Sequence, residues 1–157
     1  MISSRIIGID PGARATGWGI VQLEGRSIAL VACGVIRLDT GSGLAERLTD
    51  LGARIERILD AHGPDEAAIE DVFVHRDPRA ALKLGQARGA VIAAIARRGT
   101  RIAAYAPARV KCAVTGTGRA GKSQVARMVQ ASLGLVEPPP SDAADALAVA
   151  ICHARSL

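Results

Sequence analysis

Aromatic residues are almost missing from this chain of 157 residues, which holds one tryptophan, one tyrosine and one phenylalanine. Hydrophobic residues still make up 49% of it, so a buried core has to be built from aliphatic side chains and alanine. Cysteine is scarce as well, and Cys33, Cys112 and Cys152 show no C-x-x-C spacing. This scatter excludes a disulfide framework or a zinc site and is typical of reduced thiols.

Long apolar runs are also absent. No stretch approaches the ~18 residues that a membrane span needs, and the opening MISSRIIGID lacks the charged-then-apolar layout of a signal peptide. We therefore expect a soluble protein of the cytoplasm that has no membrane partner. The chain shows no linker, repeat or low-complexity segment, and its length predicts a single domain over residues 1–157.

Acidic residues become rare after the first 70 positions. Residues 1–70 carry 7 basic and 10 acidic side chains, whereas residues 71–140 carry 12 basic and 3 acidic ones. This asymmetry favours a polyanion such as nucleic acid as the partner, although a solvated basic face is the plainer explanation. Only Lys83, Lys111 and Lys122 among the 20 basic residues are lysines, which indicates point-charge contacts with phosphate. Lys83 fits an ordinary helix surface equally well.

Hydrophobic periodicity predicts the order β-β-β-α-β-α-β-α-α-α. Strands are predicted over residues 5–10, 18–25, 27–38, 65–74 and 101–107, with a bulge or bend at Gly34. Helices are predicted over residues 44–59, 78–99, 108–116, 121–135 and 141–157, the last capped by Ser141 or Asp142. This order implies an α/β fold, in which three antiparallel strands and two parallel ones form a mixed five-stranded sheet with helices on both faces.

Four carboxylates stand at the ends of these predicted elements. Asp10 ends the first strand, Glu70 follows an apolar run in the fourth, and Asp142 and Asp145 share one face at the start of the last helix. Each acid also has an ordinary explanation. Asp10 could form a turn and Glu70 could simply be exposed, while helix capping and the helix dipole could account for Asp142 and Asp145. A shared explanation is a site for hard cations such as Mg²⁺, which prefer oxygen ligands. Two such ions ~3.5–4 Å apart suit the in-line hydrolysis of a phosphodiester.

The stretch GTGRAGKS, residues 116–123, matches the phosphate-loop pattern G-x-x-x-x-G-K-[ST]. A nucleotide-binding loop of this kind follows an early strand, whereas only 34 residues follow Ser123 and none of them predicts a strand. The run GIDPG resembles a phosphate loop of actin- and Hsp70-like ATPases, but those enzymes need two such domains. We expect a basic connection between two helices and no nucleotide cofactor.

Five motifs, in this order, resemble those of the RuvC-type Holliday junction resolvases of bacteria: IIGIDPGARATGWG, AIEDVFV, ALKLGQARG, VKCAVTGTGRAGKSQV and SDAADALAVAI. The resemblance runs from Ile6 to about His153. It implies a ribonuclease-H-like fold and a metal-dependent endonuclease that cuts four-way DNA junctions symmetrically in recombination and repair. It further implies a homodimer, a branch-migration helicase as partner, and Mg²⁺ or Mn²⁺ as the cofactor, with two ions per site.

Carried over by position, the resemblance assigns site residues. The metal-binding acids fall on Asp10, Glu70, Asp142 and Asp145, and the catalytic lysines fall on Lys111 and Lys122. The DNA-stacking phenylalanine falls on Phe73, where base stacking is worth ~1–3 kcal/mol. Packing of Phe73 under its own loop is the alternative.

Other basic residues and the histidines carry weaker signals. Arg76 and Arg79 flank Phe73 and are expected to contact backbone phosphates, as is Lys83, unless they belong to a solvated loop. His62, His75 and His153 show no metal-ligand spacing and are expected in loops or on the surface, although His75 stands close enough to Glu70 in the sequence to reach DNA.

The long helix around residues 80–98 bears on the oligomeric state. Leu84, Ala87, Val91 and Ile95 form one stripe, part of which has to cover the sheet and the remainder of which could pair with a second copy. A non-catalytic junction-binding protein is disfavoured, because bare carboxylates weaken DNA binding. A ribonuclease-H-like nuclease with another substrate is the nearest alternative, and ALKLGQARG and Phe73 favour the junction enzyme over it.

Overall fold

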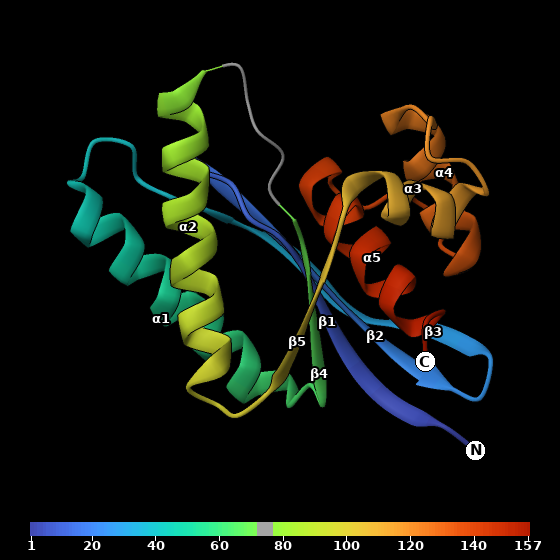
Figure 1. The fold of residues 1–157 in the computed structure, drawn as a ribbon. Coiled ribbons are helices and arrows are strands. Elements are labelled where there is room, and N and C mark those ends of the chain that lie inside the picture. Colours follow the sequence, from blue (N-terminus) through green and yellow to red (C-terminus); the bar gives the residue numbers. More distant parts are fainter. Residues whose placement is uncertain (72–76) are drawn as a thin grey trace.

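The computed structural model describes residues 1–71 and 77–157, within which five strands form one mixed sheet in the order β3-β2-β1-β4-β5 (Figure 1). The strands are β1 (Ser3–Asp10), β2 (Ala15–Glu24), β3 (Ser27–Arg37), β4 (Glu66–Glu70) and β5 (Arg101–Tyr105). The helices are α1 (Leu44–His62), α2 (Pro78–Ala96), α3 (Pro107–Thr115), α4 (Lys122–Ser132) and α5 (Ser141–Ala154). The predicted order of elements is confirmed.

The strand directions agree with the sequence-based prediction. β1, β2 and β3 pair antiparallel, whereas β4 runs parallel to both β1 and β5. Ile9 of β1 lies opposite Ile69 of β4. The next residues, Asp10 and Glu70, therefore end neighbouring strands at the same edge of the sheet. Neighbouring strands lie ~4.8 Å apart.

The sheet separates two apolar cores. Ile7 and Ile9 pack with α1 and α2 on one face, and Ile6 and Ala68 pack with α3, α4 and α5 on the other. Figure 1 shows the two helix layers on opposite sides of the strands. Because side chains alternate along a strand, Asp10 belongs to the same face as Ile6, which is the face that α5 covers.

Helix α5 lies directly on the backbone of β1 and β2, because glycines face it. A Cβ atom on Gly8 would overlap the carbonyl oxygen of Ala146, and one on Gly17 would overlap the carbonyl oxygen of Asp142. On the helix side, Asp145 is the one residue from Ala143 to Ala154 that is not fully buried. This close approach brings the start of α5 to the edge where Asp10 ends its strand.

Two local predictions are wrong. The pairing of β2 with β3 shifts register beside Val31, not at Gly34, and Gly34 instead makes room for the indole ring of Trp18. Neither Ser141 nor Asp142 caps α5, because the helix begins at Ser141 and Pro140 occupies the capping position without a side-chain hydrogen bond. Both residues therefore lie in the first turn.

Other expectations are tested more simply. All three cysteines are free, which agrees with their scattered positions. Within the described residues, no helix combines the length and the apolar character needed to cross a membrane. The predicted strand 65–74 is confirmed over β4, and its positions 72–74 lie outside the described residues.

Replacing Gly17 by Ala is expected to lower the free energy of unfolding by about 2–3 kcal/mol, because the added methyl group pushes the first turn of α5 off the sheet. The melting temperature should fall by about 5–10 °C in differential scanning calorimetry. Gly52→Ala in α1 is the control, because a Cβ there has no described atom within 4 Å, and it should be neutral or stabilising. Equal losses in both variants would contradict the close-packing argument.

Candidate active site

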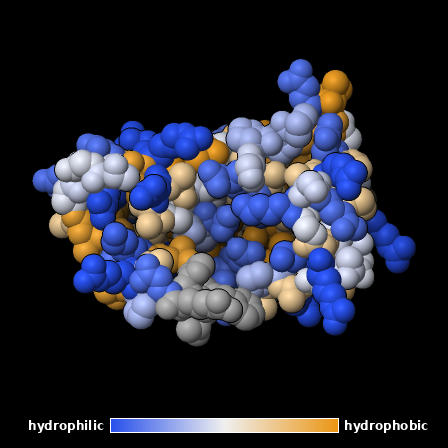
Figure 2. All heavy atoms as spheres, turned by 90° about the horizontal axis from the view of Figure 1, so that it is seen from above, coloured by the Kyte–Doolittle hydropathy of each residue, from blue (hydrophilic) through white to orange (hydrophobic). Residues whose placement is uncertain are grey.

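Five of the six predicted catalytic residues line one pocket of about 450 Å³: Asp10, Glu70, Lys111, Lys122 and Asp145. Apolar side chains complete its wall, among them Leu84, Val110 and Val125. The pocket opens at the sheet edge where β1 and β4 end and α5 begins. Hydrophilic side chains cover much of the middle of this face in Figure 2, and apolar ones show only as small patches between them.

Two helices bring the lysines to this edge. Lys111 lies in α3, and Lys122 is the first residue of α4. Gly116 ends α3 in the left-handed conformation, with φ of 85°, and Gly121 precedes the first residue of α4. The stretch GTGRAGKS therefore joins two helices, as expected, and does not follow a strand as a nucleotide-binding loop does.

Asp10 and Glu70 lie close enough together in the pocket for each carboxyl group to shift the pKa of the other. Burial, followed by repulsion from Glu70 and Asp145, raises the pKa of Asp10 to about 8. Burial also raises the pKa of Glu70, although the interaction with Asp10 opposes that shift. Both acids are therefore penalised when they ionise.

Asp145 is paired with a lysine. Its carboxylate lies 3.4 Å from the Nζ atom of Lys122, whose side chain is 78% exposed. Burial raises the pKa of Asp145 and the charge of Lys122 opposes that rise, while Asp145 raises the pKa of the Lys122 ammonium. Asp142 adds negative charge that acts on Asp10 and Asp145.

The donor set fits a hard divalent cation in its chemistry. In residues 1–71 and 77–157, no three acidic, histidine or cysteine side chains converge closely enough to ligate one ion. Asp145 is instead paired with Lys122, whereas burial and the charge of Glu70 disfavour the ionisation of Asp10. Clustering and burial penalise the ionised acids of this pocket, and a divalent cation would offset that repulsion through oxygen ligands.

A second cleft of about 580 Å³ lies on the other side of Asp142. It is lined by Arg79 and Lys83 from α2, which were expected to contact DNA, and by Arg14 from the turn between β1 and β2. The sequence reasoning missed Arg14, although it belongs to the PGARATG turn that follows Asp10.

Three predicted or discussed residues, Phe73, His75 and Arg76, lie outside the described residues. Arg88 is a further residue that the sequence reasoning missed. Its guanidinium donates to the carbonyl oxygen of Glu70 and pairs with the carboxylate of Asp71 at 3.3 Å. This contact ties α2 to the end of β4, and the ALKLGQARG motif, which contains Arg88, was the available signal.

The family model for the crossover junction endodeoxyribonuclease RuvC matches residues 6–153. The chain belongs to the RuvC family. It is 52% identical over 152 residues to the crossover junction endodeoxyribonuclease RuvC of Halorhodospira halophila, which covers 97% of this chain and 90% of that relative. The RuvC protein of Rhodospirillum rubrum is 51% identical over 151 residues, covering 96% and 89%.

Solved RuvC structures agree with the fold described above. Thermus thermophilus RuvC aligns with a TM-score of 0.87 at 39% identity, covering 96% of this chain and 93% of that one. The same protein in complex with a Holliday junction substrate aligns with a TM-score of 0.91 at 38% identity and the same coverage. The predicted ribonuclease-H-like fold and the predicted enzyme class, a crossover junction endodeoxyribonuclease, are confirmed.

Replacing Asp10 by Asn is expected to stabilise this RuvC protein in EDTA. The pKa of Asp10 is raised to about 8 from an ordinary ~3.9, so between those pH values the folded state holds a proton that the unfolded state has lost. The free energy of unfolding therefore falls as pH rises through this window, and asparagine, which cannot ionise, removes that loss. At pH 8 the gain should approach ~5 kcal/mol, since each pH unit in this window contributes up to ~1.4 kcal/mol, and each kcal/mol raises the melting temperature by ~2–4 °C.

Thermal melts from pH 5 to pH 8.5 measure this effect. The difference between Asp10→Asn and the wild type should grow with pH. Asp39→Asn is the matched control, because hydrogen bonds from Gly41 and Ser42 lower the pKa of that exposed carboxylate. A difference that stays flat with pH at Asp10 would show that the acid is not held protonated by its burial.

Proposed function

We propose that this RuvC protein hydrolyses paired phosphodiester bonds of four-way DNA junctions and leaves 5′-phosphate and 3′-hydroxyl ends. The observation that supports it most is the meeting of three carboxylates and two lysines in one pocket. The relative from Thermus thermophilus, whose structure is described as a complex with a Holliday junction substrate, supports the choice of DNA. Resolution of such junctions belongs to recombination and repair.

In this proposal Asp10, Glu70, Asp142 and Asp145 hold two Mg²⁺ or Mn²⁺ ions. Such ions, when bound, supply an activated water and stabilise the leaving 3′ oxygen. The acids themselves have to change state: Asp10 releases the proton that its raised pKa lets it keep, and Asp145 separates from Lys122. Loading of the site is therefore coupled to proton release and favoured by higher pH.

Lys111 and Lys122 bind the phosphate in this scheme. Both ammonium groups face the same pocket as the acids, so a phosphate there would meet two positive point charges. The Lys122 side chain is largely solvated and can move from Asp145 to a phosphate oxygen without burying a charge.

The basic cleft beyond Asp142 would hold DNA next to the cut site. The cleft is lined by Arg14, Arg79 and Lys83, and also by Asp142, one of the four predicted metal-binding acids. The phosphate charges of a DNA strand passing from the pocket into this cleft would be neutralised in turn. Phe73 and Arg76 remain proposed DNA contacts on the strength of the family resemblance.

A homodimer completes the proposal, because two symmetric cuts need two sites related by a two-fold axis. Ala87, Val91 and Ile95 of the expected dimer stripe are buried in the core of this chain, so a second copy has to use the other side of α2. That side presents Leu82, which is 62% exposed, and Gly89, around which no described atom would contact a Cβ.

Further parts of the proposal rest on the sequence and the family resemblance. We propose a single domain over residues 1–157, a location in the cytoplasm, and a branch-migration helicase as partner. No nucleotide cofactor takes part in this scheme, since GTGRAGKS serves DNA phosphate through Lys122.

Cleavage of a synthetic four-way junction tests the proposed activity. With Mg²⁺ or Mn²⁺ the protein is expected to nick the junction symmetrically, at least tenfold faster than a linear duplex or single-stranded DNA of the same sequence, and ATP should not change the rate. Equal cutting of all three substrates would overturn the junction claim.

Two variants separate the roles within that assay. Asp10→Asn should abolish cleavage, and Lys122→Ala should lower it by about 10²-fold through the loss of charge stabilisation near the phosphate. Asp39→Asn, in the loop between β3 and α1 and not among the residues that line the pocket, is the control and should cleave like the wild type. Full activity in Asp10→Asn would sink the metal mechanism, and full activity in Lys122→Ala would remove the lysine from it.

The basic cleft makes a separate prediction about salt. Arg14→Gln should weaken junction binding in EDTA and reduce the slope of log K against log salt by about 0.9, the value for one lost phosphate contact on duplex DNA. Arg26→Gln, in the turn at the opposite end of β2, is the matched control and should leave the slope unchanged. An unchanged slope in Arg14→Gln, measured by fluorescence anisotropy, would exclude the cleft as a phosphate-binding surface.

A further inference from the structure

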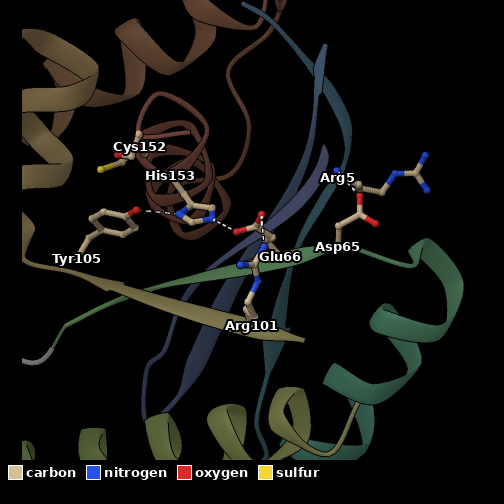
Figure 3. A network of polar contacts seen from close by, with 8 residues as sticks. Arg5, Asp65, Glu66, Arg101, Tyr105, Cys152 and His153 are labelled. Carbon is tan, nitrogen blue, oxygen red and sulfur yellow. Dashed lines mark hydrogen bonds and ion pairs between the residues drawn. The ribbon is translucent and has the colours of Figure 1, made fainter. Parts of the chain in front are cut away.

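Three hydrogen-bonded side chains, His153, Glu66 and Tyr105, form a polar chain at the far end of α5 and take no part in the proposed chemistry. His153, in the last turn of α5, is 5% exposed, contrary to the expectation of a loop or surface position. Its Nε2 atom lies 2.8 Å from Oε2 of Glu66, and its Nδ1 atom lies 2.7 Å from the hydroxyl of Tyr105 (Figure 3). The other carboxylate oxygen of Glu66 accepts from Arg101 at 3.2 Å.

One tautomer of the imidazole satisfies every member of this chain. With the proton on Nε2, His153 donates to the Glu66 carboxylate, and its Nδ1 atom accepts from the Tyr105 hydroxyl. Tyr105 then acts as donor and Glu66 as acceptor, which are the roles their groups favour. These side chains are therefore fully paired, with His153 buried and Glu66 and Tyr105 partly buried, and each bond has a defined direction.

The three members of the chain come from the elements that supply the pocket. Glu66 and Glu70 share one face of β4, and His153 is on the same helix as Asp145. Tyr105 ends β5, and a single residue separates it from the start of α3, the helix of Lys111.

Tyr105 is itself held in place by neighbours at the pocket's edge. Its carbonyl oxygen accepts from the amide of Asp71 at 2.8 Å, directly after Glu70. The Arg109 guanidinium lies 5.7 Å from the centre of its ring. The hydroxyl of Tyr105 thus connects His153 to backbone that is fixed next to the pocket.

The rotation of α5 about its own axis decides where Asp145 points. At the ~5–6 Å radius of a helix with its side chains, a turn of ~10° moves a side-chain tip by ~1 Å. A displacement of ~1 Å at a reacting centre can cost ~10²-fold in rate. The glycine contacts hold α5 close to β1 and β2, but the alanine-rich surface that meets them has little directional preference, whereas a hydrogen bond does.

We propose that His153, Glu66 and Tyr105 are positioning residues, which set the rotation of α5 and thereby place Asp145 against Glu70 and Lys111. The three positioning residues do not line the pocket, whereas Asp145, Glu70 and Lys111 do. The expected effect on cleavage rests on the proposed function, whereas the expected effect on the orientation of α5 does not.

Tyr105→Phe is the central variant, because it removes one hydroxyl and keeps the ring. His153→Leu breaks both bonds of the imidazole, and His153→Gln is the conservative variant, since its amide can donate to Glu66 and accept from Tyr105. Two controls are matched to these. Val149→Ala makes a cavity next to His153 on the same helix but removes no hydrogen bond. Arg101→Gln removes the solvent-side partner of Glu66, since the Arg101 side chain is 82% exposed.

Single-turnover cleavage of the four-way junction, well below the melting temperature, gives the first readout. Tyr105→Phe should slow cleavage by about tenfold and His153→Leu by about 10²-fold, with unchanged affinity for the junction in EDTA. His153→Gln and Arg101→Gln should keep most of the rate, as should Val149→Ala even at an equal loss of melting temperature. If Tyr105→Phe and Val149→Ala lose the same rate at the same melting temperature, the hydrogen bonds of His153 have only a structural role and the proposal is overturned.

Nuclear magnetic resonance of the metal-free protein gives a second readout that is independent of activity. The imidazole of His153 should be protonated at Nε2 alone, and the amide shifts of Asp142 and Asp145 should move in Tyr105→Phe but not in Val149→Ala. Unmoved shifts in Tyr105→Phe would overturn the inference whether or not the wild type cleaves. A wild type that leaves the junction intact would sink the proposed function, and the amide shifts would then decide the inference alone.

Discussion

The contact between α5 and the glycines of β1 and β2 is the constraint on which the site depends. Side chains at Gly8 and Gly17 would occupy the space of the α5 backbone, so their absence lets the helix lie against the sheet itself. Asp142 and Asp145 reach the edge of β1 only because that distance is short. An ordinary helix-on-sheet packing, with side chains in between, would hold these two acids several ångströms farther from Asp10.

Acidic and basic residues that are separated along the sequence come together at this edge of the sheet. The acids come from two strand ends and from α5, whereas the lysines come from α3 and α4, the segment in which basic residues outnumber acidic ones. Burial raises the pKa of Asp10, Glu70 and Asp145, so each acid is penalised when it ionises. The neighbouring lysines oppose this penalty only in part, which leaves the acids able to bind further positive charge.

The positions of Asp10 and Glu70 could be predicted from the sequence, because an acid at the end of an apolar strand has few places to go once the strands are parallel and in register. The element order was predictable for the same reason, since it follows from periodicity. The bulge at Val31, the capping of α5 by Pro140 and the burial of His153 could not be predicted this way. The bulge and the burial of His153 depend on which residue of a distant element lies opposite, which one sequence does not contain. The start of α5 is a helix boundary, which sequence patterns locate only to within a residue or two.

Different interactions act at the two ends of α5, because the first turn carries acids and the last turn carries His153. Its first turn bears two acids whose charges repel each other and repel Asp10 whenever it ionises, a force that pushes the helix away from the sheet. Apolar burial along the rest of the helix opposes that force, and it acts without regard to rotation. A site built from mutually repelling groups thus needs a second, directional attachment, and the fully paired chain through His153 provides one at the end where no catalytic group has to move. Stability lost at the acids is in this way recovered along the same helix, which keeps the acids close enough together to bind a cation.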